Sequence, residues 1–163
     1  IYQDYRMKYF AYGSNMNPYR MIDRKIEFSA PVVGYLPGYR LTFNKIAANV
    51  GEGYANIVPD KNSIVEGVLY EINKSGMQKL DFFEGYPWHY RRVKIKIILE
   101  DTTTVDAFTY IAAKNMTVEG LRPSKQYLYH LIKAAKHFLS KGYYQMLLEY
   151  ASNNNKEQNY KLF

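Results

Sequence analysis

The four residues Tyr12-Gly13-Ser14-Asn15 follow a short apolar and aromatic run and precede a helix start. A strand that ends in Gly-Ser-Asn ahead of a helix exposes successive backbone N–H groups, which form a concave site for a carboxylate or an oxyanion. Asn15 adds a side-chain donor. An ordinary turn is the alternative, in which Gly13 supplies an unusual dihedral angle and Ser14 or Asn15 satisfies nearby backbone. The turn alone leaves both interpretations open.

Glu84 is the candidate acid–base group, because it lies at the end of a predicted helix among apolar and aromatic side chains. These neighbours are Leu80, Phe82 and Phe83 before it and Tyr86, Trp88 and Tyr90 after it. Such surroundings desolvate a carboxylate and raise its pKa toward the range that suits proton transfer. A negative charge at a helix C-terminus also opposes the helix dipole, so the placement needs a reason. The alternative is a solvent-facing glutamate.

The elements that must position these residues follow from periodicity and from turn residues. Seven segments have strand character: residues 7–12, 26–33, 40–45, 54–58, 64–72, 91–99 and 103–112. Asn17-Pro18 predicts the start of a short helix over residues 19–24. A second helix is capped by Asn73 and stopped by Gly85-Tyr86-Pro87. A third begins at the Ser124 cap with Gly142 as its terminator, and residues 143–150 form the last helix.

The order of these elements predicts an α+β fold, with a curled sheet or small mixed or antiparallel β-barrel of about six to seven strands and flanking helices. A length of 163 residues fits one domain. We assign this domain to residues 7–152. Residues 1–6 are an N-terminal extension, with Met7 a candidate natural start, and residues 153–163 are a polar C-terminal tail that we expect to be loose.

Composition excludes several kinds of site. The chain has no cysteine and three histidines, so disulfides, thiolate nucleophiles and sulfur-ligated zinc sites are excluded. His130 and His137 lack the tight spacing of a zinc-binding helix, and we expect no metal. The net charge is +7, and the basic residues are scattered along the chain. We therefore expect no nucleic-acid or membrane partner. No membrane-span-length apolar run or signal-peptide pattern is present, which predicts a cytoplasmic protein.

The chain resembles the γ-glutamylcyclotransferase-like family in a series of ordered segments. These are Tyr9-Phe10-Ala11-Tyr12-Gly13-Ser14-Asn15-Met16, Tyr54-Ala55-Asn56-Ile57-Val58-Pro59, Val65-Glu66-Gly67-Val68-Leu69-Tyr70-Glu71-Ile72, Leu80-Asp81-Phe82-Phe83-Glu84-Gly85, and Tyr90 with Arg91. The joint order of a Tyr-Gly-Ser-Asn turn, a Gly-Val-Leu-Tyr strand and a Leu-Asp-x-x-Glu-Gly helix end is much more specific than any one segment. The resemblance extends from Met7 to about Phe138.

The resemblance implies a small mixed barrel with flanking helices and a cofactor-free reaction. In that reaction the free α-amino group of a γ-glutamyl compound attacks its own γ-carbonyl, which releases an amine and forms 5-oxoproline. Glu84 would be the general base and then the general acid. The substrate's γ-glutamyl part would be bound by Gly13, Ser14 and Asn15, with Tyr12 as a wall of the pocket.

Two further tyrosines are candidate substrate-binding residues by the same resemblance. Tyr90 approximates the tyrosine that the family has near the acid, and its alternative is a ring that packs at a strand start. Tyr127 lies in Pro123-Ser124-Lys125-Gln126-Tyr127, a segment similar to one in relatives that act on γ-glutamyl amino acids. Its alternative is a place on the buried stripe of a Ser-capped helix.

Three functions remain open at this point. The first is a cyclotransferase for γ-glutamyl amino acids or dipeptides, with a small-molecule substrate. The second keeps the site but changes the leaving group to that of a γ-glutamylamine or a carrier-linked γ-glutamyl compound. The third is a non-catalytic module that binds an anion or nucleic acid, for which association would be salt-dependent and turnover absent. Monomer and homodimer both stay open.

Overall fold

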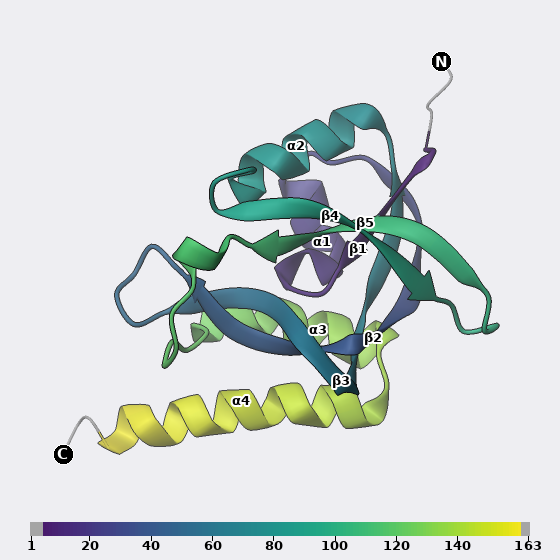
Figure 1. Ribbon diagram of the computed structural model, residues 1–163. Helices are drawn as coiled ribbons and strands as arrows, with labels where there is room; N and C mark the ends of the chain where they lie inside the picture. Colours follow the sequence, from purple (N-terminus) through teal and green to yellow (C-terminus); the bar gives the residue numbers. More distant parts are fainter. Residues whose placement is uncertain (1–4, 161–163) are drawn as a thin grey trace.

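A closed β-barrel forms the centre of the fold (Figure 1). The computed structural model describes residues 5–160, with side chains for residues 5–152. The strands within this part are β1 (Met7–Ala11), β2 (Phe28–Ile46), β3 (Gly53–Ile72), β4 (Tyr90–Ile98) and β5 (Thr104–Ala112). Their order around the barrel is β1-β3-β2-β4-β5. The parallel contact between β1 and β5 at Tyr9 and Phe108 closes the ring, and the other pairs are antiparallel.

The barrel confirms the predicted class of fold but corrects the number of strands, which is five rather than six to seven in the described chain. Segments 26–33 and 40–45 both contribute to β2, and segments 54–58 and 64–72 are both parts of β3. Proline, glycine and aspartate lie between the two segments of each pair, and these residues predicted turns. Instead, Pro59 pairs with Tyr39 and Ile64 pairs with Pro37, so residues 60–63 bulge out of a continuous ladder.

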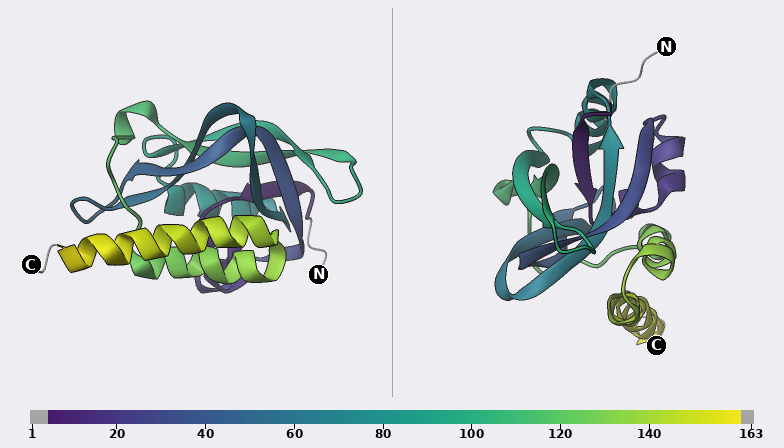
Figure 2. Two further views of the ribbon diagram at one scale, coloured as in Figure 1. Left: turned by 90° about the horizontal axis from the view of Figure 1, so that it is seen from below. Right: turned by 90° about the vertical axis from the view of Figure 1, so that its right-hand side faces the viewer.

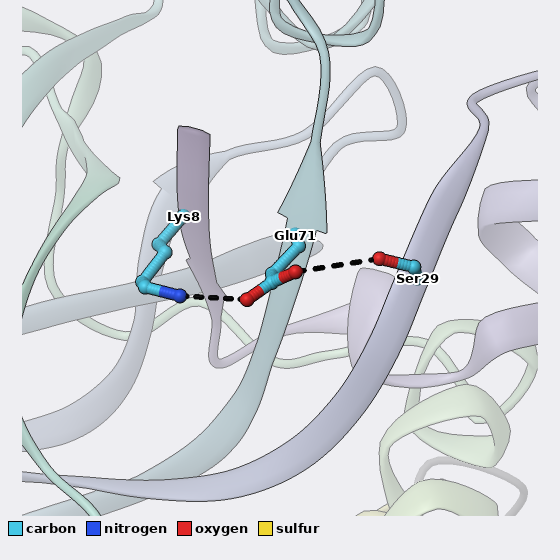
Figure 3. A network of polar contacts seen from close by, with 3 residues as sticks. All are labelled: Lys8, Ser29 and Glu71. Atoms are coloured by element: carbon cyan, nitrogen blue, oxygen red, sulfur yellow. Dashed lines mark hydrogen bonds and ion pairs between the residues drawn. The ribbon is translucent and has the colours of Figure 1, made fainter. Parts of the chain in front are cut away.

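The register of β3 against its two neighbours is fixed in part by Glu71 (Figure 3). Lys8 Nζ on β1 donates to Glu71 Oε1 at 2.8 Å, and Ser29 Oγ on β2 donates to Glu71 Oε2 at 3.5 Å. One carboxylate therefore bridges three adjacent strands. This holds β1, which ends in the Tyr12-Gly13-Ser14-Asn15 turn, against the longest ladder of the barrel.

The helices lie on opposite sides of the barrel (Figures 1 and 2). The α2 helix (Lys74–Glu84) is on one side, and α3 (Lys125–Phe138) packs beside α4 (Lys141–Tyr160) on the other. The short helices are α1 (Pro18–Asp23) and the 3-10 turns η1 (Ser14–Met16) and η2 (Lys114–Met116). The predicted caps are confirmed: the side chains of Asn17, Asn73 and Ser124 each accept a hydrogen bond from a backbone N–H in the first turn.

Two expectations about the C-terminal region are wrong. Gly142 does not end α3, which stops at Phe138, but lies in the first turn of α4. The Ser140 side chain accepts from the Tyr143 N–H at 3.2 Å and so starts a new helix where a terminator was predicted. The α4 helix then continues to Tyr160, through polar residues that we expected to be loose. Residues 1–4 and 161–163 of the predicted terminal segments lie outside the described residues.

The core fills the barrel and the space beneath α3 and α4. Its largest fully buried side chains include Phe10, Met16, Tyr70, Leu80 and Leu131. Within residues 5–160, none of the helices combines the length and the apolar composition that crossing a bilayer requires.

Candidate active site

A pocket of about 580 Å³ opens where the turn after β1, the end of α2 and the β2–β3 hairpin meet. All the residues that the sequence singled out line it: Tyr12, Gly13, Ser14, Asn15, Glu84, Tyr90 and Tyr127. They are far apart in the sequence and come from both ends of the chain. The fold therefore brings the whole predicted set to one cavity.

The turn is held by buried tyrosines. Tyr12 Oη donates to the backbone carbonyl of Tyr110, and Tyr70 Oη donates to the carbonyl of Asn15 at 2.7 Å. Gly13 has φ −110°, so it is not in the left-handed region that favours glycine. Close packing explains why this position is a glycine, because an added Cβ would lie 3.0 Å from Tyr127 Oη and 3.2 Å from Ala55 Cβ. Glycine here allows the backbone to approach the opposite wall.

Tyr90 and Tyr127 bind the same peptide segment of β3. Tyr127 Oη accepts a hydrogen bond from the Ala55 N–H at 3.0 Å, and Tyr90 Oη donates to the Ala55 carbonyl at 2.7 Å. Tyr90 thus bonds the backbone in this structure, and its role in substrate binding stays a prediction. Both phenols line the pocket and are also part of its framework.

Glu84 is the last residue of α2, as predicted, and Gly85 ends the helix with φ 65°. Its carboxylate is half-buried and accepts a hydrogen bond from Asn15 Nδ2, with 3.4 Å from Nδ2 to Oε1. The expected cause of its desolvation is confirmed only in part: Tyr90 is buried, whereas Phe82 is 80% exposed and Trp88 is 76% exposed. The barrel wall desolvates Glu84, since Tyr9, Tyr12 and Tyr90 are buried around the same cavity.

Burial raises the pKa of Glu84 above its ordinary value, and the cations Arg24, Arg20 and Lys45 act in the opposite direction. The acid is therefore less ready to ionise than a surface glutamate, while nearby positive charge keeps its carboxylate form accessible. Arg24 is tied to the same network, because its guanidinium donates to Asn15 Oδ1 at 2.9 Å. Asn15 also donates to Tyr9 Oη at 3.1 Å, so its amide links the acid, a cation and a phenol.

The end of α2 is fixed to the barrel one turn before Glu84. Asp81 accepts from Tyr110 Oη at 2.6 Å and from Arg92 at 2.8 Å. The Tyr110 backbone in turn accepts from Tyr12. The acid and the turn are therefore anchored to the same point of β5.

Sequence reasoning missed several residues of this pocket, among them Tyr9, Arg20, Arg24 and Lys45. Arg20 and Arg24 are four residues apart on the predicted helix that directly follows the turn, a spacing that places both on one helix face. Lys45 alternates with the buried residues Leu41 and Phe43, which indicates an inward position. His89 also lines the pocket. Among the side chains of residues 5–152, no cluster of three His, Cys, Asp or Glu could hold a metal ion.

Comparison with known proteins identifies the family. The sequence matches the family described as γ-glutamyl cyclotransferase, AIG2-like, over residues 9–131, which is most of the chain. The chain belongs to this family. The resemblance drawn from the turn, the strand and the helix end is thereby confirmed, and each of those segments lies within the matched range.

Named relatives agree with membership of the γ-glutamyl cyclotransferase, AIG2-like family. The human γ-glutamylcyclotransferase is 27% identical over 133 residues, which are 78% of this chain and 69% of that protein. A candidate γ-glutamylcyclotransferase of Methanocaldococcus jannaschii is 36% identical over 62 residues, which are 35% of this chain and 52% of that protein. The chain thus matches about half the length of this archaeal relative. A solved γ-glutamyl cyclotransferase structure has a TM-score of 0.76 at 27% identity, with 86% of this chain and 85% of that chain covered.

Proposed function

We propose that this protein is a γ-glutamylcyclotransferase that converts γ-glutamyl amino acids or dipeptides to 5-oxoproline and a free amine. The observation that carries the proposal is the half-buried carboxylate of Glu84, hydrogen-bonded to Asn15 of the turn in a pocket lined by three cations. Family membership supports the reaction class. The proposed chemistry needs no cofactor, because nucleophile and electrophile belong to one substrate molecule.

In the proposed mechanism, Glu84 first takes a proton from the substrate's α-ammonium group. The free amine then attacks the γ-carbonyl carbon, so that a new C–N bond closes the five-membered ring. Glu84 returns the proton to the leaving nitrogen as the old C–N bond breaks, and then carries a second proton from the ring nitrogen to the released amine. Of the three protons on the α-nitrogen, one stays on the lactam and two end on the released ammonium. A carboxylate with a raised pKa suits both directions of transfer.

The rest of the pocket would select the folded substrate conformer. Orientation of two groups in one molecule can supply roughly 7–11 kcal/mol of the barrier. We assign the γ-glutamyl part to Gly13, Ser14 and Asn15, whose backbone lies where the chain turns into η1. Tyr12, Tyr90 and Tyr127 would form the walls. Because Asn15 already bonds Glu84, Tyr9 and Arg24, its side chain would act by holding the acid in place.

The experiment that tests the proposal is release of 5-oxoproline from a panel of γ-glutamyl amino acids, γ-glutamylamines and γ-glutamyl peptides. Glu84→Gln keeps the shape of the side chain but removes the proton carrier, and its turnover should fall by roughly 100-fold or more. Its substrate affinity should be retained. The matched control is Glu100→Gln, since Glu100 is exposed in the β4–β5 turn.

Two outcomes would overturn the proposal. Turnover of Glu84→Gln at the natural rate would remove Glu84 as the proton carrier. Absence of 5-oxoproline from every compound, with a folded natural protein, would reject the cyclotransferase activity on this panel. Salt-dependent binding of an anion without turnover would then favour the non-catalytic module.

A further inference from the structure

Lys45 presents a buried positive charge to the pocket from the side of the β2–β3 hairpin. It is the next-to-last residue of β2 and is 3% exposed. Its ammonium group donates to the Ile46 carbonyl at 2.6 Å. The following residues Ile46, Ala47 and Ala48 also line the pocket. The positive charge is thus built into the wall and is not a mobile surface lysine.

The surroundings of this ammonium group hold it without neutralising it. The rings of Tyr90 and Tyr54 lie 5.6 and 5.8 Å from Nζ, at cation–π distance. Among the described residues, no carboxylate lies within 4.0 Å of Nζ. Burial lowers the pKa of Lys45, and the more distant Glu84 raises it. Buried charges are normally paired, so an unpaired one that lines a cavity indicates an anionic ligand.

A second cation of the pocket also lacks an anionic partner among the described residues. The Nε of Arg20 on α1 is buried without a hydrogen-bond acceptor among the described residues. Arg24 differs, because its guanidinium is bonded to Asn15. Arg20 belongs to the helix directly after the turn, whereas Lys45 belongs to the hairpin. The pocket therefore offers two unpaired cations from two different walls.

We propose that Lys45 binds the carboxylate of the leaving amino acid, which makes γ-glutamyl-α-amino acids, rather than γ-glutamylamines, the substrate class. This inference rests on the proposed cyclotransferase function. A γ-glutamyl amino acid carries two carboxylates, one on the glutamyl part and one on the leaving group. Arg20 beside the turn matches the first, and Lys45 on the hairpin matches the second. A γ-glutamylamine has one carboxylate and leaves Lys45 buried without an anion.

The test compares two substrates that differ by a single carboxylate, γ-glutamyl-alanine and γ-glutamyl-ethylamine. The natural protein should prefer γ-glutamyl-alanine in kcat/KM by roughly 10- to 100-fold, the worth of one charge-assisted hydrogen bond. Lys45→Met removes the charge with little change in volume and should lose that preference. Its kcat/KM should fall roughly 10-fold or more further on γ-glutamyl-alanine than on γ-glutamyl-ethylamine, so the ratio of the two values reports the carboxylate contact separately from any effect of Lys45 on Glu84. Lys96→Met, at an exposed lysine of β4, is the control.

Each result separates this inference from the function on which it rests. If the natural protein releases 5-oxoproline from neither substrate, the cyclotransferase proposal itself fails on them. If it uses both substrates equally well, the enzyme stands and the role of Lys45 is wrong. An equal loss on both substrates in Lys45→Met, with a shifted pH profile, would mean that Lys45 acts on Glu84 instead. Lys45→Gln gives the same comparison should the methionine variant not fold.

Discussion

The side-chain amide of Asn15 lies between Glu84 and Arg24, donating to the carboxylate at 3.4 Å and accepting from the guanidinium at 2.9 Å. A neutral residue thereby bonds both an acid and a cation, which form no direct ion pair with each other among the described residues. A direct ion pair would lower the pKa of the acid. The amide keeps Glu84 in position and leaves its raised pKa in place.

Asn15→Asp should move the acid limb of the pH–rate profile to higher pH. A second carboxylate beside Glu84 disfavours ionisation of the pair. The ionised form of Glu84, which acts as the base, is therefore populated only at higher pH. The measurement is kcat/KM for 5-oxoproline release across pH. Asn62→Asp, at an exposed position, should leave the profile unchanged. An Asn15→Asp profile that coincides with that of the natural protein would disprove the coupling.

The stability of the fold should depend on pH through Glu84. Its pKa is higher in the folded protein than its ordinary value of 4.5, so the folded state binds the proton more tightly. The free energy of unfolding should therefore fall as pH rises from about 4.5 through the raised pKa. Glu84→Gln should flatten this part of the curve and be the more stable protein at neutral pH. Urea unfolding at a series of pH values measures both, and parallel curves would contradict the expectation.

Gly13→Ala should destabilise the protein by about 1–3 kcal/mol, the usual cost of overpacking. The added methyl group would lie 3.0 Å from Tyr127 Oη, at the point where this hydroxyl binds Ala55. Tyr127→Phe removes the hydroxyl, so the double variant should lose less stability than the two single losses added together. The coupling should be about 0.5 kcal/mol or more by urea unfolding. If the two single losses of stability add exactly in the double variant, the added methyl group does not clash with the Tyr127 hydroxyl.

Asp81→Asn should cost about 1–3 kcal/mol of unfolding free energy, because the buried Tyr110 and the partly buried Arg92 lose a charged acceptor. Since Asp81 fixes the end of α2, kcat should fall as well. Asp106→Asn removes a comparable ion pair with Lys96 on the surface and should cost at most about 1 kcal/mol. Equal losses in the two variants would mean that the Asp81 network does not anchor the helix.

Local signals in the sequence predicted much of this fold correctly. The helix starts at Asn17-Pro18, Asn73 and Ser124 are confirmed, because a cap depends on a few neighbouring residues. Glu84 was predicted at the end of its helix for the same reason. The long strands were not predicted, since the bulge opposite Pro37 exists only through pairing of β2 with β3. Gly142 likewise lies inside a helix that Ser140 starts.

The sequence predicted which residues line the candidate site but not which of them are hydrogen-bonded to each other. The residues of the turn, the acid and the two tyrosines all line one pocket. Their roles within it remain proposals. Which groups bond each other depends on side-chain directions across the barrel, as with Tyr90 and Ala55. The contacts of Lys45 could not be predicted either. Its alternation with Phe43 indicates that the side chain faces inward, but not which groups it contacts.

The long pairing of β2 with β3 makes the pocket sensitive to the number of residues as well as to their identity. Leu41, Phe43 and Lys45 face inward in alternation. Side chains on a strand change sides at every step, so one residue inserted between Phe43 and Lys45 would turn the lysine outward and place the newcomer in the wall. A single inserted or deleted codon here would remove the charge from the pocket while every residue of the acid and turn stayed the same.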